Sequence, residues 1–422
     1  MIEKTDKKQY SPVYMEREKR VNQAIALEKP DRVPVVSLAD SFMTSVSGLT
    51  EKEAMFDYDK FAEAWLDNSI KLNFDMAPSP QARMSGKLLE LMGVRTISWP
   101  GGQLDDNCPF QYVESEILED NEFDELLANP GDFTLRKILS RMSETLNPLS
   151  MVPFLHSLAY GYSPATSIPA ILGAPPVMEM LKRLIQVGEE SNRFNAMLGK
   201  LSEDLAEKGY PLTYGGLGLC PFDFVSDFLR GMRGSMLDLF KRPEKLKAAV
   251  ELFTPVCIGN AIYMAQLNGS SRVFIPLHRG ADGFMSNDQF REFYWPGLKT
   301  LLLALIDAGL TPLPFFEGSY TSRLEFLREL PKGKILAHMD QVDIDKFKKV
   351  LGDTICFWGN VPGSMLIAGT KGQTADYVKK LIDIFGDNGG LIVDGSIEGI
   401  PSQAKIENVM AMIETVHYYG KY

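Results

Sequence analysis

Short apolar segments alternate with amphipathic stretches along most of the 422 residues, and this alternation leaves few folds open. Eight segments are candidate strands, and several of them are continuous apolar runs, as in strands buried on both faces. They cover residues 32–38, 72–77, 211–214, 272–277, 311–316, 334–337, 354–358 and 390–393. Strands that alternate with helices predict βα units and a parallel sheet, and eight such units make a (β/α)8 TIM barrel.

The stretches between the later segments have the pattern of helices with defined ends. Residues 298–308, 322–329, 343–350 and 373–385 are each followed closely by glycine or proline. These residues end helices, because glycine adopts the left-handed conformation of a cap and proline lacks the amide hydrogen that the next turn needs. We therefore expect helices at these four places.

The spacing of the segments is uneven between the second and the third. Residues 78–210 separate them and contain a tract rich in Gly, Pro and Ser at 160–177. Long excursions inside compact domains are often lids over an active site. We expect one TIM-barrel domain over residues 1–422, with an inserted helical cap or lid at 78–210; the alternative is an ordinary surface excursion.

Charge and cysteine content restrict the partners and the compartment. The 44 Lys and Arg residues stand against 55 Asp and Glu, a net charge of −11, and an acidic surface repels nucleic acid. The first twenty residues are charged and no run of eighteen apolar residues occurs, so we expect neither a signal peptide nor a membrane span. Four cysteines without a C-x-x-C pair predict a reducing, cytoplasmic compartment.

Polar side chains follow several predicted strands, at the end where TIM barrels hold their active sites. Glu317 ends the fifth strand in LPFFEGSY, and His338 ends the sixth in ILAHMD. Consecutive strands bring both side chains to one rim, and Glu398 follows the eighth strand. Three such oxygen and nitrogen ligands with an open position make a catalytic zinc site. The alternatives are an ion pair between Glu317 and a cation, and a scaffold role for His338.

A second pair of carboxylates precedes the fourth strand. Asp223 and Asp227, in CPFDFVSDFLRGM, have the i, i+4 spacing that places two side chains on one face of a helix. They can act together, although a position in the first turn of a helix explains Asp223 equally well.

Longer motifs from the fourth predicted strand onward resemble those of the uroporphyrinogen decarboxylase superfamily. They are MSNDQFREFYWPGLK (285–299), FFEGSY (315–320), CFWGNVPGSMLIAGT (356–370) and GIPSQAKIENVMAMIETV (399–416), with RVPV at 32–35 and CPFDFVSDFLRGM at 220–232. The resemblance touches nearly the whole chain outside the insertion. The superfamily contains decarboxylases and corrinoid-dependent methyltransferases, and membership implies the barrel fold.

This chain differs from the motifs of several branches of the superfamily, and the differences reduce the number of activities that the resemblance implies. The decarboxylases grip porphyrinogen acid groups with an N-terminal arginine motif, whereas residues 35–45 read VVSLADSFMTS without arginine. The thiol methyltransferases hold zinc with His-x-Cys and a further Cys, where this chain has Phe315-x-Glu317 and Glu398. The Glu317-x20-His338 spacing resembles the aryl methyl ether O-demethylase methyltransferases (methyltransferase I), although Leu302 replaces a further glutamate of that pattern.

The resemblance therefore implies an enzyme that takes the methyl group of a methoxylated aromatic and passes it to the Co(I) corrinoid of a partner protein. Zn2+ held by Glu317, His338 and Glu398 would act as a Lewis acid on the ether oxygen, with His278 or Asp394 as other third ligands. His278 or Arg279 would hold a phenol oxygen or a ring carboxylate. Apolar contacts to the ring are expected from Phe42, Met43, Met76, Tyr214 and Tyr320, unless these are simply core.

The sequence is also compatible with other functions. The chain could move a methyl group from a methylcorrinoid to tetrahydrofolate or a thiol, or could decarboxylate another acid. A third alternative is a scaffold that docks a corrinoid protein without a metal or turnover. A homodimer is expected from the superfamily.

Overall fold

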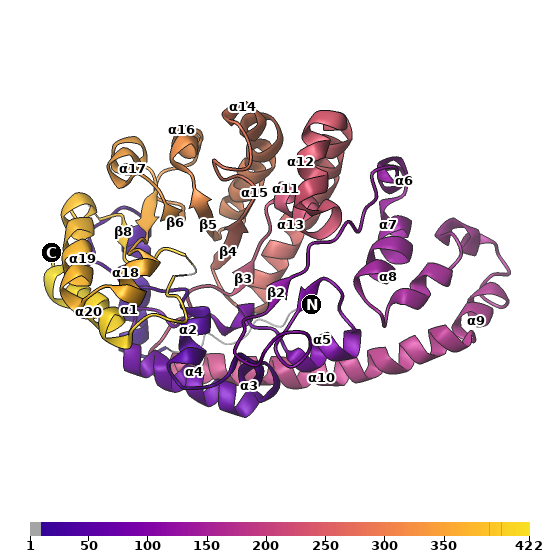
Figure 1. The fold of residues 1–422 in the computed structure, drawn as a ribbon, viewed down its shortest axis with the longest axis horizontal. Coiled ribbons are helices and arrows are strands. Elements are labelled where there is room, and N and C mark those ends of the chain that lie inside the picture. Colours follow the sequence, from indigo (N-terminus) through magenta and orange to yellow (C-terminus); the bar gives the residue numbers. More distant parts are fainter. Residues whose placement is uncertain (1–9, 388, 398) are drawn as a thin grey trace.

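Parallel strands form the central sheet in this computed structural model, which describes residues 10–387, 389–397 and 399–422. The named strands lie side by side in chain order, as expected where a helix connects each strand to the next. Their bounds are β3 (Gly216–Leu217), β4 (Arg272–Leu277), β5 (Thr311–Ser319), β6 (Leu336–Gln341), β7 (Cys356–Trp358) and β8 (Leu391–Ile392). Figure 1 shows helices on the outer side of this sheet.

Two extended segments close the sheet into a barrel. The first predicted strand, residues 32–38, lies between β8 and the second predicted strand, residues 72–77. The second predicted strand pairs with the residues just before β3. The parallel pairs are Val35 with Val393, Val36 with Met76, and Ala77 with Leu212. The (β/α)8 fold is thus confirmed. The first segment forms only isolated bridges, since the amide of Val35 donates to the carboxylate of Asp75 at 2.8 Å instead of to a strand.

Strands β5 and β6 continue beyond their predicted ends, to Ser319 and Gln341. Glu317 and His338 therefore lie within strands and not after them. The register of β5 against β6 shifts between Phe316 and Ser319, at a bulge that contains Gly318 with a φ of 85°. Such a bulge re-aims side chains, and Glu317 is exposed although the residues before it are buried.

The outer helices follow the strands as the sequence predicts. Those after β3 and β4 are α11 (Pro221–Val225), α12 (Gly231–Lys241), α13 (Pro243–Leu267), α14 (Asn287–Gln289) and α15 (Trp295–Asp307). Those after β5 to β8 are α16 (Leu324–Leu327), α17 (Ile344–Leu351), α18 (Gly363–Ala368), α19 (Lys371–Phe385) and α20 (Ile406–Tyr419). Gly216 lets α13 approach β3 closely, because a Cβ there would lie 2.8 Å from Val273 and 3.0 Å from Ala265.

Aromatic side chains from neighbouring strands fill the barrel interior. Tyr214 stacks on Phe274 and Phe274 on Phe315, while His338 meets Phe315 and Trp358 edge to face. The pairing register explains this layer, because His338 lies opposite Phe315 on one side and Trp358 on the other. The interior is thus a packed core, as in other TIM barrels.

Helices dominate the N-terminal part and the predicted insertion. The N-terminal helices are α1 (Pro12–Ile25), α2 (Asp40–Ser45), α3 (Glu51–Phe56) and α4 (Tyr58–Leu72). Residues 78–210 hold η1 (Pro80–Ala82), α5 (Gly86–Met92), β1 (Ile97–Ser98), β2 (Gln111–Tyr112), α6 (Phe123–Ala128), α7 (Pro130–Phe133), η2 (Thr134–Ile138), α8 (Leu139–Met142), η3 (Asn147–Met151), η4 (Leu155–Ala159), α9 (Ser167–Leu172) and α10 (Pro175–Glu207).

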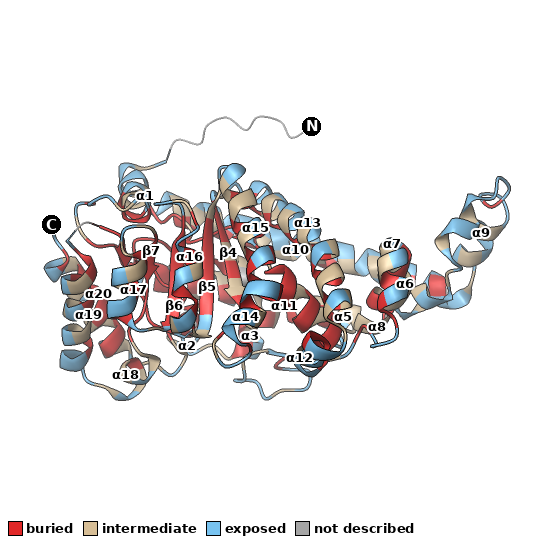
Figure 2. Cartoon of the chain, turned by 90° about the horizontal axis from the view of Figure 1, so that it is seen from above, coloured by how far each residue is buried: buried red, intermediate tan, exposed pale blue. Residues whose placement is uncertain are grey.

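The insertion divides into a part that packs on the barrel and a part that projects from it. The C-terminal half of α10 carries the buried residues Leu198, Leu201 and Leu205, and the helix packs on α4 and α5. Helix α9 and the start of α10 extend away from the body (Figure 2). Helices occupy much of 78–210, and the interpretation of this region as an inserted cap or lid stays a prediction.

One helix in the described residues, α13, is long and apolar enough by length and composition to cross a membrane. In the fold it forms part of the barrel wall, against β3, α11 and α15. Phe253, Cys257, Ala261 and Ala265 form its buried face. The rest of the helix is less buried: 33% of its apolar window is buried, and Val256, Tyr263 and Leu267 are exposed.

Candidate active site

Asp223 anchors a polar cluster at the C-terminal ends of β4 and β5. It lies in the first turn of α11, is 1% exposed, and accepts three hydrogen bonds. The donors are the amides of His278 at 2.9 Å and Arg279 at 3.0 Å and the hydroxyl of Tyr294 at 2.6 Å. Burial and the nearby charge of Asp227 raise the pKa of Asp223 to about 6. Asp223 therefore fixes the backbone that leaves β4.

Two π-helical turns bring further groups to this cluster. Asp227 lies in η5 (Ser226–Arg230) and Tyr294 ends η6 (Phe290–Tyr294). A π turn contains an extra residue, which changes the direction of the side chains that follow, and such turns are frequent at functional sites. Asp223 and Asp227 contact the same two residues: Asp223 accepts the backbone amides of His278 and Arg279, and Asp227 contacts their side chains.

His278 is the central side chain of the cluster. Its Nδ1 lies 2.5 Å from Oδ2 of Asp227, whose Oδ1 lies 3.1 Å from Nη2 of Arg279. Burial acts to lower the pKa of His278, but the hydrogen bond to Asp227 and the charges of Asp223, Asp227 and Glu317 together raise it to about 9. The imidazole is therefore held in one orientation and favours the cationic form.

Glu317 faces the other ring nitrogen of His278. Its Oε2 lies 3.6 Å from Nε2 of His278, longer than a hydrogen bond, and the carboxylate side chain is 53% exposed. The alternative of an ion pair, considered from the sequence, thus has a definite partner in His278. His278 directly follows β4 and Glu317 lies on the adjacent β5, at the barrel end where active sites form.

His338 lies inside the barrel and is fully buried. Its Nε2 lies 3.1 Å from Oδ2 of Asp394, which also accepts the amide of Leu38, and its Nδ1 has no hydrogen-bond partner among the described residues. Asp394 accepts the amide of Gly395 through its other oxygen. His338 and Asp394 therefore bond to each other and tie β6 to the end of β8.

The donor atoms at the mouth of the barrel fit a divalent ion in part. Among the described residues, no group of three or more His, Cys, Asp and Glu is arranged to hold a metal. Two ligands of a tetrahedral zinc lie roughly 3.3 Å apart when each bond is about 2.0 Å, so Glu317 and His278 fit as a pair at 3.6 Å. The hydrogen bond from His278 to a carboxylate is typical of metal-bound imidazoles.

The predicted third ligand, Glu398, lies outside the described residues. The set of Glu317, His338 and Glu398 therefore stays a prediction. His338 would have to bind through Nδ1, or give up Asp394, to join it.

The predicted substrate contacts fall into two groups. Met76 and Tyr214 line the barrel interior, and Tyr320 donates its hydroxyl to the carbonyl of Leu277 at 3.3 Å. Phe42 and Met43 lie on α2, are fully buried, and belong to the core outside the barrel. Packing accounts for the burial of all five, and their role in substrate binding stays a prediction.

The predicted site residues do not include Tyr294 and Asp340. Asp340 lies on β6, is 4% exposed, and accepts the amide of Gly318 at 3.0 Å, next to Glu317 in the chain. Burial and the charge of Glu317 raise the pKa of Asp340. An Asp two residues after His338 points to the same strand end, whereas nothing in the sequence indicates the direction of the Tyr294 hydroxyl.

Known proteins resemble this chain in sequence and in fold. The family model described as Uroporphyrinogen decarboxylase (URO-D) matches residues 160–419, more than half of the chain. A solved methyltransferase from Methanosarcina mazei has a TM-score of 0.63 at 17% identity, covering 96% of this chain and 98% of that chain, which shows a shared fold. No match was found among curated proteins. The chain belongs to the uroporphyrinogen decarboxylase (URO-D) family.

Proposed function

We propose that the protein is a methyltransferase that takes the methyl group of a methoxylated aromatic and passes it to the Co(I) corrinoid of a partner protein. The observation that carries the proposal is the row Asp227, His278 and Glu317 at the mouth of the barrel. It places an oriented imidazole and a solvent-exposed carboxylate where a small molecule and a docking protein can both reach them.

The chemistry requires positive charge beside the ether oxygen. Co(I) attacks the methyl carbon, the carbon–oxygen bond breaks, and its electron pair goes to the phenol oxygen, which finally takes a proton. Phenolate leaves poorly unless that negative charge is stabilised as it develops. Nε2 of His278 is the atom at which this chain can supply such stabilisation.

The residues around His278 maintain that charge. Asp227 fixes the ring through Nδ1, and Arg279 neutralises the outer oxygen of Asp227. His278 and Glu317 would hold a divalent ion such as Zn2+, which would supply a Lewis acid for the ether oxygen. To bind the ion, His278 would release the proton that its pKa of about 9 keeps on it in the metal-free chain.

The cysteines favour an oxygen leaving group over thiol transfer. Cys220, Cys257 and Cys356 are buried, and burial raises the pKa of each thiol. The fourth, Cys108, is exposed in the insertion and belongs to none of the contacts at the mouth. Carboxylate and imidazole are harder donors than thiolate and leave a bound ion more acidic toward oxygen.

The experiment is methyl transfer from a panel of methoxylated aromatics to Co(I) cobalamin, with methylcobalamin formation followed by absorbance. We expect transfer by the wild-type protein, loss of transfer on chelation, and recovery with Zn2+. The absence of transfer from every aryl ether, together with transfer from methylcobalamin to a thiol or tetrahydrofolate, would overturn the proposal.

The metal ligands are tested separately by metal content. His278→Gln and His338→Gln distinguish the pair seen at the mouth from the set predicted from the sequence. Glu325→Gln, an exposed glutamate on α16, is the matched control for Glu317→Gln. We expect metal loss in the His278 and Glu317 variants; loss in the His338 and Glu317 variants, with metal retained by His278→Gln, would favour the predicted set.

A further inference from the structure

A basic cavity of about 370 Å³ lies in the insertion and shares no residue with the candidate active site. Four of the residues that line it are cationic, namely Arg95, Arg136, Lys137 and Arg141, and the others are two serines and an asparagine. Among the described residues, neither a carboxylate nor an apolar residue lines it. Such a cavity is unusual in a chain with a net charge of −11, and it favours small anions.

Two segments of the insertion bring these cations together. Arg95 lies between α5 and β1, whereas Arg136 and Lys137 lie on the π-helical turn η2 and Arg141 on α8. The segments adjoin, because the amide of Arg95 donates to the carbonyl of Met142 at 2.9 Å. A π turn changes the direction of the side chains that follow it and is frequent at functional sites.

Lys137 and Arg141 are already paired with carboxylates. Nζ of Lys137 lies 2.8 Å from Oε1 of the buried Glu122, and Nη1 of Arg141 lies 2.6 Å from its Oε2. Glu125 also lies 2.7 Å from Lys137, and Glu119 lies 4.0 Å from Arg141. Hydrogen bonds, first from Arg141 and then from Lys137, lower the pKa of Glu122 to about 2. Glu122 therefore stays charged, and these two cations add little net charge to the cavity.

Arg136 is held in place with its two terminal nitrogens free. Its Nε donates to Oδ2 of the buried Asp132 at 2.9 Å, and Oδ1 of Asp132 accepts the amide of Leu155 at 2.9 Å. Its guanidinium carbon lies 6.0 Å from the centroid of the Phe154 ring. No described residue forms a hydrogen bond or ion pair with Nη1 or Nη2 of Arg136. A guanidinium fixed through Nε can donate from both of these nitrogens to two oxygens of one anion.

Arg95 is the cation without a counter-charge. Its side chain is exposed, and no described residue forms an ion pair or a side-chain hydrogen bond with it. The cavity therefore offers two guanidinium groups with free donors. A carboxylate has one charge and two oxygens and satisfies one guanidinium, whereas a phosphate carries about −1.5 to −2 charges at neutral pH on three acceptor oxygens and can bond to both.

We propose that this cavity binds a phosphate group, either free or carried by a small polar molecule, through Arg95 and Arg136. The lining residues are all polar or charged, so the rest of such a ligand would be a polyol or a sugar and not an aromatic base. The net negative charge of the chain disfavours nucleic acid as the source of the phosphate. The proposal is independent of methyl transfer, because the cavity and the candidate active site have no residue in common.

The test is calorimetric binding of glycerol 3-phosphate, inorganic phosphate and acetate to the full chain at one ionic strength. We expect both phosphates to bind at least tenfold more tightly than acetate, because they can engage both arginines. Tighter binding of glycerol 3-phosphate would assign the site to an organic phosphate, and tighter binding of inorganic phosphate would assign it to the free ion. Acetate binding as tight as that of the phosphates, or no binding of either phosphate, would overturn the proposal.

Three variants show whether the arginines of the cavity bind the ligand. Arg95→Gln breaks no ion pair and should weaken phosphate binding at least tenfold, with the same circular dichroism as wild type. Arg136→Lys keeps a cation beside Asp132 but lacks the paired terminal nitrogens, and it should weaken binding as well. Arg183→Gln, at an exposed position on α10, removes the same charge elsewhere in the insertion and should bind like wild type. Unchanged binding in both cavity variants, or equal weakening in Arg183→Gln, would overturn the assignment.

Discussion

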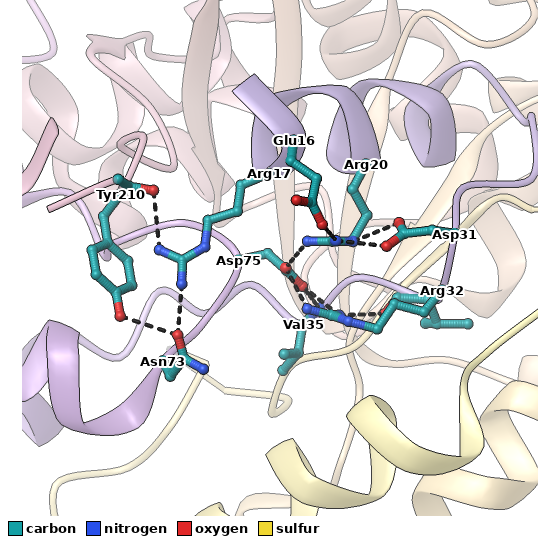
Figure 3. Close-up of polar contacts among 11 residues, drawn as sticks. Glu16, Arg17, Arg20, Asp31, Arg32, Val35, Asn73, Asp75 and Tyr210 are labelled. Carbon is teal, nitrogen blue, oxygen red and sulfur yellow. Dashed lines mark hydrogen bonds and ion pairs between the residues drawn. The ribbon is translucent and has the colours of Figure 1, made fainter. Parts of the chain in front are cut away.

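Charged side chains are paired more completely at one end of the barrel than at the other. At the N-terminal end, Asp75 lies 2.7 Å from both Arg20 and Arg32, and Arg20 also binds Glu16 and Asp31, as Figure 3 shows. Asp75 is 1% exposed and every oxygen of its carboxylate is bonded. We call this the closed end of the barrel, because its buried carboxylate and arginines neutralise one another.

At the C-terminal end the charges are present but incompletely paired. Glu317 is exposed at 3.6 Å from His278, and Asp340 has one oxygen without a partner among the described residues. Partial pairing costs stability, and it persists where the groups are used for binding or catalysis. The comparison teaches that a substitution at the closed end should affect folding, and one at the open end should affect activity.

Replacing Asp75 should have the largest effect. Asp75→Ala leaves two largely buried arginines without their shared carboxylate, so we expect the free energy of unfolding to fall by about 3–5 kcal/mol. Asp31→Ala is the control, because that side chain is 56% exposed and its loss should cost about 1 kcal/mol or less. Urea denaturation with an unchanged slope measures both. Equal costs would show that the closed end does not depend on its buried carboxylate.

Replacing Glu317 should separate activity from stability. We expect Glu317→Gln to lower methyl transfer at least 100-fold, about 2.7 kcal/mol in the barrier, because the carboxylate beside His278 is lost. The free energy of unfolding should change by less than about 0.5 kcal/mol, since the side chain is exposed. Steady-state kinetics and denaturation together measure this. A destabilised variant with full activity would reverse the assignment of the two ends.

The barrel was predictable from the sequence because its signal is local. Apolar runs such as 272–277 and 311–316 can bury both faces, and the helices between them stop at glycine or proline. The first two strands were also located, although they form only isolated bridges. The end of β5 was placed too early, since the bulge at Gly318 depends on contacts with β6 that no local pattern reveals.

The candidate site was only partly predictable. Glu317, His278 and Arg279 are predictable because they follow apolar strands, which is a local signal. The contact between His278 and Asp227 depends on a π turn and on packing between distant segments. The spacing of residues in the sequence therefore does not predict it. His338 was assigned to the rim because the sequence does not show how far β6 continues beyond it.

Removing the Tyr294 hydroxyl should have a moderate effect. Tyr294→Phe deletes one of the three donors to buried Asp223, at a cost of about 1–2 kcal/mol in the free energy of unfolding. The two backbone donors at His278 and Arg279 remain, so the cost should be below that of Asp75→Ala. Denaturation compares the variants. A cost as large as that of Asp75→Ala would show that the open end is as tightly coupled to folding as the closed one.

The smallest effect concerns His417, on α20 near the closed end. Burial and the charges of the arginines there, Arg32 foremost, lower its pKa to about 4, the opposite direction to His278. Between pH 6.5 and 4 the unfolded chain binds this proton and the folded chain does not, so stability falls as the pH falls. After allowance for solvent screening, we expect on the order of 1 kcal/mol.

Denaturation at several pH values measures this effect as the difference between wild type and His417→Asn, because the carboxylates titrate equally in both. The variant should lose less stability than wild type as the pH falls from 6.5 to 4. His156→Asn, at an exposed position in the insertion, should behave like wild type. Parallel pH profiles of wild type and His417→Asn would mean that folding does not lower the pKa of His417. The closed end would then accept a further positive charge, and the contrast with the mouth would rest on the carboxylates alone.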